Sequence, residues 1–384
     1  MTALLSPTLL TGAEAVAHAM RQVDPDVVPV YPITPQTPMI ETFAKFAADG
    51  RTHAEIVNVE SEHSAMSAAV GAALAGARTM TATSSQGLAL MAEVVYIAAS
   101  MRAPLVMAVG NRALSGPINI HCDHSDSMLV RDSGCVQLFA ENAQEAYELM
   151  VLAPRLAERG DVLLPVLVCQ DGFNVTHTAE PVQLVDDEAV REWVGDYDIP
   201  HALLSSGITT QGPFSMPDSY FELKVGQARA LEAALPAFDE LARELVPVTG
   251  HRLRALDRYR LDDAETAIVA MGSSAETVKD VVDSLRADGY PVGLLAIRSF
   301  RPFPIEAVRE ALEWVDDVHV LDRALAPGAA APLYADIAAA LYGALDVRLH
   351  GHVYGLGGRD LLPEHVRSVF DGTANDYVGL RWDG

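Results

Sequence analysis

Glu62 is the first of two charged side chains whose position could serve chemistry. It follows the apolar run AEIVNVE and opens a helix of small residues. The simpler interpretation is that Glu62 has a structural role, because a carboxylate in the first turn of a helix complements the helix dipole. The small residues would also let another backbone or a flat ring approach closely, so Glu62 could instead bind a heterocycle nitrogen. These residues are Ala65, Ser67, Ala68, Ala69, Gly71, Ala72, Ala73 and Ala75.

Arg112 is the second such side chain, and it ends the apolar run from Pro104 to Gly110. A guanidinium group at such a place must reach water or an anionic partner. Asp123, Asp126 and Asp132 follow in the next loop and could form a structural salt bridge with it. Alternatively, the forked guanidinium could bind a substrate carboxylate. The sequence alone does not decide between an internal aspartate and a substrate carboxylate as the partner of Arg112.

Other suggestive segments have simpler interpretations. The loop 118–134 crowds two histidines and three aspartates but offers no clean tetrahedral ligand set, so we expect no metal on this chain and leave the role of His121–Asp126 open. The three cysteines match no zinc or iron–sulfur spacing and are expected to be buried free thiols. The glycine-rich YGLGGRD (354–360) predicts a tight turn against another domain, not a dinucleotide site.

Composition narrows the function classes. The chain has 384 residues, is 50% hydrophobic and carries a net charge of −25. Such acidity disfavours nucleic acid and anionic membrane surfaces as partners. No apolar stretch is long enough for a membrane helix, and the first residues lack the charged region of a signal peptide. We therefore expect a cytoplasmic protein.

The first 180 residues alternate between apolar runs and helical patterns. Apolar strands joined by helices predict an α/β fold with a parallel sheet covered on both faces. The expected strands are 27–33, 54–60, 78–84, 104–112 and 162–172. Ligands of such sheets bind at the carboxyl ends of the strands. The polar residues at those ends are Thr34, Glu60, Glu62, Thr83, Ser84, Ser85, Gln86, Asn111, Arg112 and Asp171.

The second half divides into two parts. Residues 181–220 form an irregular excursion rich in Pro, Gly and acidic residues, followed by an amphipathic helix. From residue 264, strand and helix patterns alternate again and predict a second, smaller α/β domain. We thus expect a first domain over 1–245, a linker over 246–263 and a second domain over 264–384.

Several segments together are specific to one family. They are YPITPQTP (31–38), VESEHSA (59–65), TATSSQG (81–87), NRALSGPINIHCDHSD (111–126), RDSG (131–134) and YGLGGRD (354–360). In this order they resemble the alpha subunit of pyruvate:ferredoxin oxidoreductases, of the 2-oxoacid:ferredoxin oxidoreductase family. The resemblance implies a thiamine-diphosphate-binding fold of the pyrimidine-binding type, followed by a smaller domain like the transketolase C-terminal domain.

The resemblance also implies cofactors and partners. Thiamine diphosphate would be shared with a beta subunit, whose GDG motif holds the diphosphate and Mg²⁺; this chain has no GDG. The 4Fe-4S clusters would lie on beta and delta chains or on fused domains, and none on this chain. Gamma and delta chains, or fused equivalents, would be further partners. Coenzyme A would be the co-substrate and ferredoxin or flavodoxin the electron acceptor. The enzyme would be a hetero-oligomer, active only with its partners.

Residue roles follow from the same resemblance. Thr34, Glu62 and Arg112 match residues near the substrate, at the aminopyrimidine ring and at the substrate carboxylate. Asn111 matches a neighbouring substrate-side position, and Ser84, Ser85, Gln86 and Gly87 a cofactor-side segment. The role of Asp171, in QDGF, stays open. A carboxyl group at the ring's N1′ favours the imino form that activates thiamine. Pyruvate would be decarboxylated oxidatively to acetyl-CoA and CO₂, or made by the reverse reaction.

Other functions stay open. Within the family, the substrate could be 2-oxoglutarate, a branched-chain 2-oxo acid or an aryl glyoxylate. From another class, the chain could be a non-catalytic assembly subunit, although Glu62 and Arg112 are both present. A two-domain nucleotide-binding protein is disfavoured because the chain lacks a GxGxxG fingerprint that opens a long helix.

Overall fold

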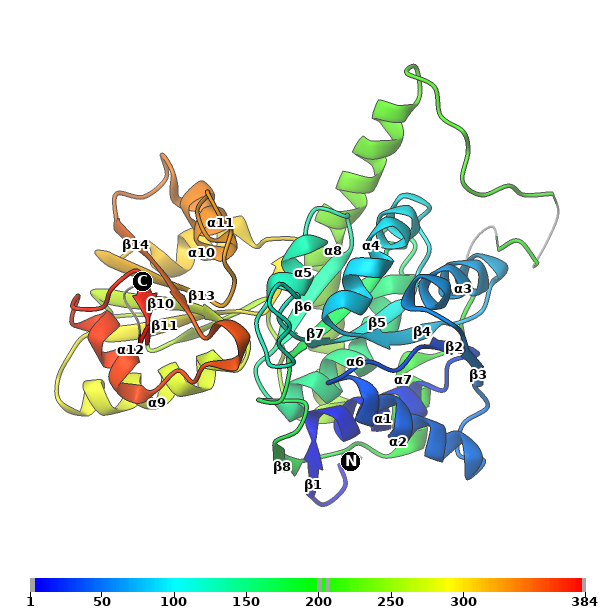
Figure 1. The fold of residues 1–384 in the computed structure, drawn as a ribbon, viewed down its shortest axis with the longest axis horizontal. Helices are drawn as coiled ribbons and strands as arrows, with labels where there is room; N and C mark the ends of the chain where they lie inside the picture. Colours follow the sequence, from blue (N-terminus) through cyan, green and yellow to red (C-terminus); the bar gives the residue numbers. More distant parts are fainter. Residues whose placement is uncertain (1–3, 199–201, 205–207, 382–384) are drawn as a thin grey trace.

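The computed structural model describes residues 4–198, 202–204 and 208–381, which form two lobes (Figure 1). The first lobe runs from strand β1 (Thr8–Thr11) to helix α8 (Tyr220–Thr249). The second lobe runs from β9 (Leu256–Tyr259) to β15 (Tyr377–Val378). No helix in these described ranges is long and apolar enough to cross a membrane.

A parallel sheet forms the centre of the first lobe. Its strands are β2 (Val27–Val30), β3 (Glu55–Asn58), β4 (Met80–Thr83), β5 (Val106–Asn111), β6 (Val136–Ala140) and β7 (Val166–Asp171). They are ordered β6-β7-β5-β4, and the parallel pair β2-β3 joins this edge by a bridge between Val27 and Thr79. Every residue of β4 to β7 is buried, as in a sheet covered on both faces. The predicted parallel sheet is confirmed.

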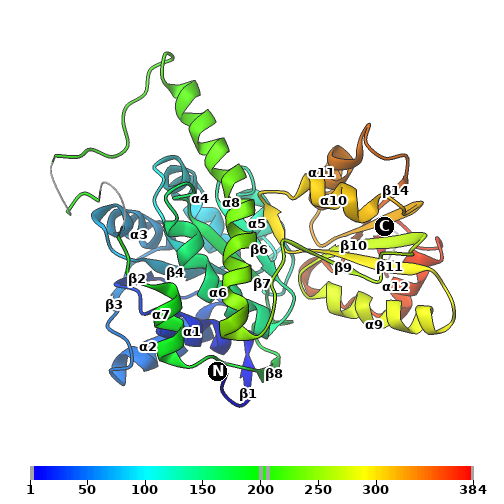
Figure 2. The same ribbon diagram turned by 180° about the vertical axis from the view of Figure 1, so that it is seen from behind.

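Helices cover both faces of this sheet (Figures 1 and 2). One layer holds α1 (Gly12–Val23), α2 (Thr37–Ala48) and α6 (Ala143–Glu158), and the other holds α3 (Glu62–Ala75), α4 (Ser85–Ser100) and the short α5 (Ser125–Leu129). Helix α3 begins where the Ser61 hydroxyl accepts a hydrogen bond from the Ser64 amide (3.2 Å). It ends at Gly76, whose φ of 106° suits glycine.

The structure also contains elements that the sequence did not indicate. Strand β1 pairs with β8 (Ala179–Val182), and β6 lies in a segment for which we predicted no strand. The excursion over 181–220 is not wholly irregular, because it contains α7 (Asp187–Val194), which Asp186 caps. The predicted amphipathic helix is α8, whose first turns project beyond the lobe (Figure 2).

The second lobe is built on a six-stranded sheet in the order β15-β14-β13-β10-β11-β9. All neighbours are parallel except β9 and β11. Its remaining elements are β10 (Thr266–Met271), α9 (Ser274–Ala287), β11 (Val292–Ile297), α10 (Ile305–Leu312), β13 (Asp317–Asp322), α11 (Pro332–Leu341), β14 (Arg348–Tyr354), the 3₁₀ turn η1 (Leu356–Gly358) and α12 (Pro363–Phe370). The predicted linker, 246–263, contains the end of α8 and all of β9. The predicted division into domains stays a prediction.

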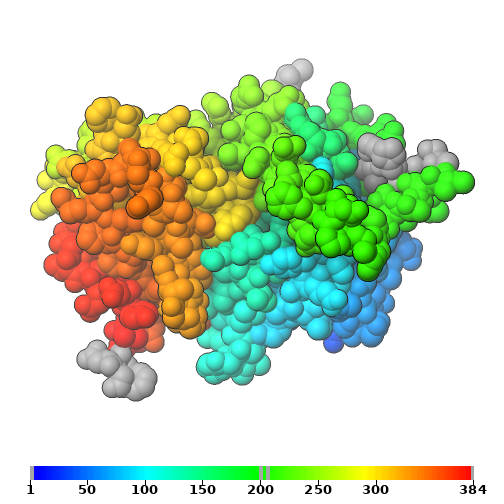
Figure 3. All heavy atoms as spheres, turned by 90° about the horizontal axis from the view of Figure 1, so that it is seen from above, coloured from blue at the N-terminus to red at the C-terminus, as the bar shows by residue number. Residues whose placement is uncertain are grey.

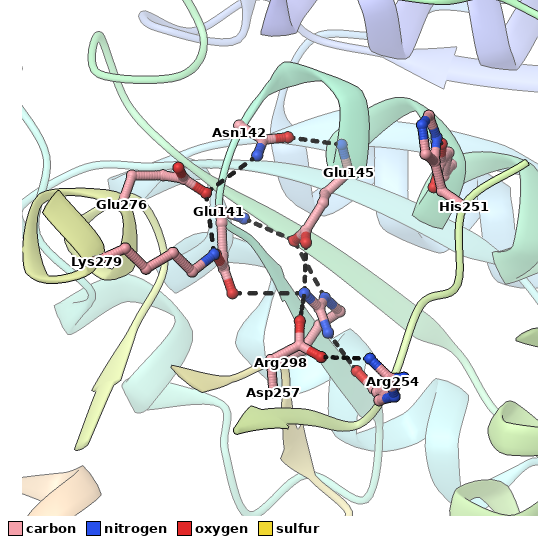
Figure 4. A network of polar contacts seen from close by, with 10 residues as sticks. Glu141, Asn142, Glu145, His251, Arg254, Asp257, Glu276, Lys279 and Arg298 are labelled. Carbon is pink, nitrogen blue, oxygen red and sulfur yellow. Dashed lines mark hydrogen bonds and ion pairs between the residues drawn. The ribbon is translucent and has the colours of Figure 1, made fainter. Parts of the chain in front are cut away.

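Strand pairing and ion pairs both join the two lobes. Strand β12 (Ser299–Arg301) follows β11 in the chain, but it pairs antiparallel with β6 of the first lobe. Seen from above, the atoms of the second lobe pack directly against those of the first (Figure 3). Arg298 is buried and binds Glu145 and Asp257, while Lys279 binds Glu141 (Figure 4). Charge and backbone pairing thus act together at one interface.

Candidate cofactor and substrate site

Glu62 is the first residue of α3 and its side chain is buried, with 7% exposure. It faces the start of α4. A Cβ at Gly87 would lie 2.9 Å from Glu62 Oε1 and 2.4 Å from Thr83 Oγ1, closer than real contacts allow. Only glycine therefore leaves room for the Glu62 carboxylate here. Among the described residues, no group hydrogen-bonds to this carboxylate, so it remains available to a ligand.

Buried polar atoms without partners gather beside Glu62 and at the end of β5. They are Thr83 Oγ1, Ser84 Oγ and Asn111 Oδ1. An unsatisfied buried polar group costs about 1–3 kcal/mol, and native proteins keep few of them. A polar ligand at this edge of the sheet would satisfy such atoms. By contrast, Ser85 Oγ lies 2.6 Å from both Ala113 O and Gln86 Oε1, so these two predicted cofactor residues are engaged within the protein.

Arg112 lies at the end of β5, and its side chain is buried except for a small exposed fraction. Its Nη1 donates to Thr34 O (3.0 Å) and its Nε to Asn119 O (2.9 Å). Burial lowers the pKa of the guanidinium, and Asp126 opposes that shift. No carboxylate in the described part of the chain forms an ion pair with Arg112. Because a guanidinium has five N–H donors, three remain for an external anion.

Asp126 is a site residue whose role the sequence did not show. It does not pair with the Arg112 guanidinium, which was one of our two hypotheses. Its carboxylate instead accepts hydrogen bonds from the backbone N–H groups of Arg112 (3.0 Å) and Ser85 (2.9 Å) and from Asn111 Nδ2 (2.9 Å). Burial raises the pKa of Asp126 to about 6, and these donors oppose that rise. Asp126 therefore fixes the ends of β4 and β5 relative to each other.

Asp171 ends β7 and connects the two lobes. It is fully buried and lies 2.7 Å from His124 Nε2, while Arg323 Nη1 (2.7 Å) and the Ser273 amide (3.0 Å) donate to it from the second lobe. Burial alone would raise its pKa, but Arg323 and His124 hold the pKa well below its usual range. With all its bonds inside the protein, Asp171 is a structural residue.

The glycine turn after β14 supports the loop that holds Arg112. Asn119, which accepts from Arg112, donates through Nδ2 to Gly357 O (3.0 Å), and the Gly358 amide donates to Cys122 O (2.7 Å). A Cβ at Gly358 would lie 2.3 Å from His121 Cβ, so the turn requires glycine. The predicted tight turn is present, and it contacts the loop of the first lobe. All three cysteines are buried and free, as predicted.

The predicted site residues thus form two groups at one sheet edge. Thr34 and Arg112 are joined by a hydrogen bond, and Glu62 lies against Gly87. Ser84 lies between the groups, because a Cβ at Gly110 would be 3.1 Å from Ser84 Oγ and 3.4 Å from the proline after Thr34. Glu62 follows β3 and Arg112 follows β5, so a carboxylate and a forked cation lie at the carboxyl ends of two strands of this sheet. They could bind the two reactants, a heterocycle and an anionic substrate.

Comparison with solved structures places the fold in a known class. The chain resembles a chain of the 2-oxoglutarate:ferredoxin oxidoreductase from Magnetococcus marinus with a TM-score of 0.76 and 18% identity, over 96% of this chain and 65% of that one. It resembles a split-gene transketolase with a TM-score of 0.57 and 13% identity, over 95% and 97%. The chain therefore shares its fold with a 2-oxoacid:ferredoxin oxidoreductase chain and a transketolase. Together with the family match of residues 18–242, this confirms the predicted thiamine-diphosphate-binding fold.

Sequence comparison is more specific. Residues 18–242 match the thiamine-diphosphate-binding part of pyruvate flavodoxin/ferredoxin oxidoreductases, and residues 264–366 match core domain II of pyruvate:ferredoxin oxidoreductase. The chain is 54% identical to pyruvate synthase subunit PorA of Thermotoga maritima, over 99% of this chain and 100% of the relative. It is 38% identical to the alpha subunit of the NADH-dependent phenylglyoxylate dehydrogenase of Aromatoleum evansii, over 95% and 90%. The chain belongs to the pyruvate:ferredoxin oxidoreductase family.

Proposed function

We propose that this chain is the alpha subunit of an enzyme that converts pyruvate and coenzyme A to acetyl-CoA and CO₂, with electrons passed to ferredoxin or flavodoxin, or that runs this reaction in reverse. Relatives named pyruvate synthase subunit PorA, at 41–54% identity, support pyruvate as the substrate. The observation that carries the proposal is Arg112, a buried guanidinium whose three remaining donors have no carboxylate partner in the described chain.

The residues beside Glu62 fit the aminopyrimidine half of thiamine diphosphate. Glu62 is buried and has no hydrogen-bond partner among the described residues. Gly87 leaves room for its carboxylate, and Thr83 Oγ1 lacks a hydrogen bond. Thiamine diphosphate supplies a nucleophilic carbon and an electron sink for decarboxylation. Glu62 would hold a proton on its carboxyl group against a ring nitrogen, which is a general acid–base role. A site closed to water strengthens that contact.

Arg112 and Thr34 would bind the substrate. The Thr34 carbonyl and the Asn119 carbonyl fix the guanidinium plane, so the remaining N–H groups are already oriented when a carboxylate arrives. Such fixed, charged donors bind a carboxylate in a defined direction. Asp126 holds the backbone at Arg112 and so acts as a positioning residue.

The remaining parts of the enzyme would come from partner subunits. A beta subunit would bind the diphosphate and Mg²⁺, because this chain has no GDG motif. The 4Fe-4S clusters would lie on beta and delta chains or on fused domains, and a gamma chain would complete a cytoplasmic hetero-oligomer. The names of the relatives, which call them subunits, support an assembly of this kind.

Co-expression with the candidate beta, gamma and delta chains tests the proposal. The assembled enzyme should reduce methyl viologen when given pyruvate and coenzyme A. The isolated chain should be colourless and inactive, which a visible absorption spectrum and the same assay will show. A brown isolated chain, or turnover without partners, would contradict the proposed division of labour.

An aryl 2-oxo acid is the second candidate substrate, because the chain also resembles a phenylglyoxylate dehydrogenase subunit. Comparing kcat/KM for pyruvate, phenylglyoxylate, 2-oxoglutarate and a branched-chain 2-oxo acid on the same enzyme preparation decides between them. We expect pyruvate to have the highest value.

A further inference from the structure

A cluster of three histidines and one aspartate lies on the second sheet, outside the candidate site. Asp317 and His319 alternate along β13, and His350 and His352 alternate along β14, so all four point to the same face of the sheet. His319 and His350 are direct partners in the parallel register. One ligand atom each from Asp317, His319 and His350 lies within 4.8 Å of the other two.

The hydrogen bonds of the cluster fix which ring nitrogens carry protons. His352 Nδ1 lies 3.1 Å from Asn375 O, which can only accept, so this nitrogen is protonated. In the neutral ring, His352 Nε2 is then an acceptor, and His319 Nδ1, 3.0 Å away, must donate to it. The other nitrogen of neutral His319, Nε2, is left with a free lone pair. No group in the described chain hydrogen-bonds to that nitrogen.

His319 lines a cavity that could receive a cation. The residue is only 5% exposed. The ring stacks on His350, with centroids 4.7 Å apart. The cluster lines a cavity of about 540 Å³, and the carboxylates of Asp371 and Asp376 line the same cavity.

We propose that Asp317, His319 and His350 bind one divalent transition-metal ion of the zinc, cobalt or nickel class. Imidazole and carboxylate donors suit these ions, and three protein ligands leave a position for water. A metal-bound histidine usually donates its other N–H to an acceptor that fixes the ring. His352 is the acceptor beside His319, and its own ring is oriented by a hydrogen bond to the Asn375 carbonyl.

Arg348 competes for the same aspartate. Its Nε lies 2.9 Å from Asp317 Oδ1, and its Nη2 also binds this carboxylate, while His350 Nε2 lies 3.3 Å from Oδ1. The Arg348 side chain is 67% exposed, so it can swing into water with little loss. The guanidinium thus takes the place of the cation when no metal is bound. Removing it should tighten metal binding.

Titration of the full-length chain with Zn²⁺ tests the proposal. The protein should carry no polyhistidine tag and should be stripped with a chelator, and binding should be followed by calorimetry. We expect one saturable site. His319→Asn and His350→Asn should abolish it, and His352→Phe should weaken it by about 10–100-fold, as for other ligand-orienting residues. Co²⁺ should give a visible absorption band of the same stoichiometry.

His53→Asn is the matched control, because His53 is an exposed histidine 2.7 Å from a carboxylate, that of Asp24. It should leave Zn²⁺ binding unchanged. Circular dichroism checks that each variant folds. If the His319 variant does not fold, the affinity of Arg348→Ala for Zn²⁺ tests the proposal instead. Arg348 is exposed, so this variant should fold. Absence of saturable binding to the wild type, or an unchanged affinity in Arg348→Ala, would overturn the proposal.

Discussion

Arg112→Ala should lower kcat/KM for pyruvate by about 10²-fold or more in the assembled enzyme, because losing a charged, hydrogen-bonded contact costs about 2–5 kcal/mol. The effect on stability should be smaller. Within the protein the guanidinium loses only its bonds to Thr34 O (3.0 Å) and Asn119 O (2.9 Å). Each of these two hydrogen bonds contributes about 1.5–3 kcal/mol to stability. The variant also removes a buried charge without a carboxylate partner, which offsets part of this loss. We expect the free energy of unfolding to fall by about 1–3 kcal/mol.

Arg102→Ala is the matched control for this prediction. Among the described residues, the Arg102 guanidinium also bonds only main-chain carbonyls. Its closest contacts are with Val162 O (2.6 Å) and Leu163 O (3.1 Å). Burial lowers its pKa as it does that of Arg112. Both variants should lose stability, as urea unfolding will show, but only Arg112→Ala should lose kcat/KM. Arg112→Lys should recover little, because an ammonium cannot reproduce the fork. Equal kcat/KM for the two alanine variants, per folded enzyme, would refute a substrate role.

Three further changes test the site and its support. Glu62→Gln should slow exchange of the thiamine C2 proton by about 10²–10⁴-fold with an unchanged fold, whereas exchange at the wild-type rate would make Glu62 a helix-end charge only. Gly87→Ala should push the Glu62 carboxylate aside and lower kcat/KM, with about 1–3 kcal/mol of lost stability from overpacking; unchanged kinetics would mean that the carboxylate position does not matter. Asp171→Asn should cost about 3–5 kcal/mol in urea unfolding, because it leaves Arg323 buried without its partner. Since the pKa of Asp171 is lowered on folding, its contribution should be complete above about pH 4 and shrink below it; a difference that is independent of pH would contradict the ion pair.

The local sequence pattern predicted the strands that are apolar throughout. It did not predict strands whose pairing depends on residues far away in the sequence. Strands β4, β5 and β7 were predictable because each is a continuous buried run. Strand β6 was missed because the short run VQLFA follows a polar loop, and one of its two partners, β12, is far away in sequence. For the same reason, nothing local shows that the chain changes sheet between β11 and β12.

For the candidate site too, the sequence predicted some contacts and not others. That Thr34 and Arg112 would meet was predictable, because the carboxyl ends of parallel strands lie at one sheet edge. The sequence placed Asp126 near Arg112 but could not tell which donor it binds, since an aspartate in a loop can accept from a side chain or from main-chain amides. The structure shows that Asp126 binds main-chain amides, so no carboxylate in the described ranges pairs with the Arg112 guanidinium.

The second lobe therefore contributes to the candidate site without providing a residue that would touch the substrate. The guanidinium of Arg112 is oriented by Asn119 O, and Asn119 is held by Gly357 O of the second lobe. Gly358 packs so closely on His121 that a side chain there would displace the same loop. A loop without regular structure is held in place only by such contacts. Gly357 and Gly358 of YGLGGRD are thus explained by the orientation of an arginine in the other lobe, because that orientation depends on how closely the two lobes approach.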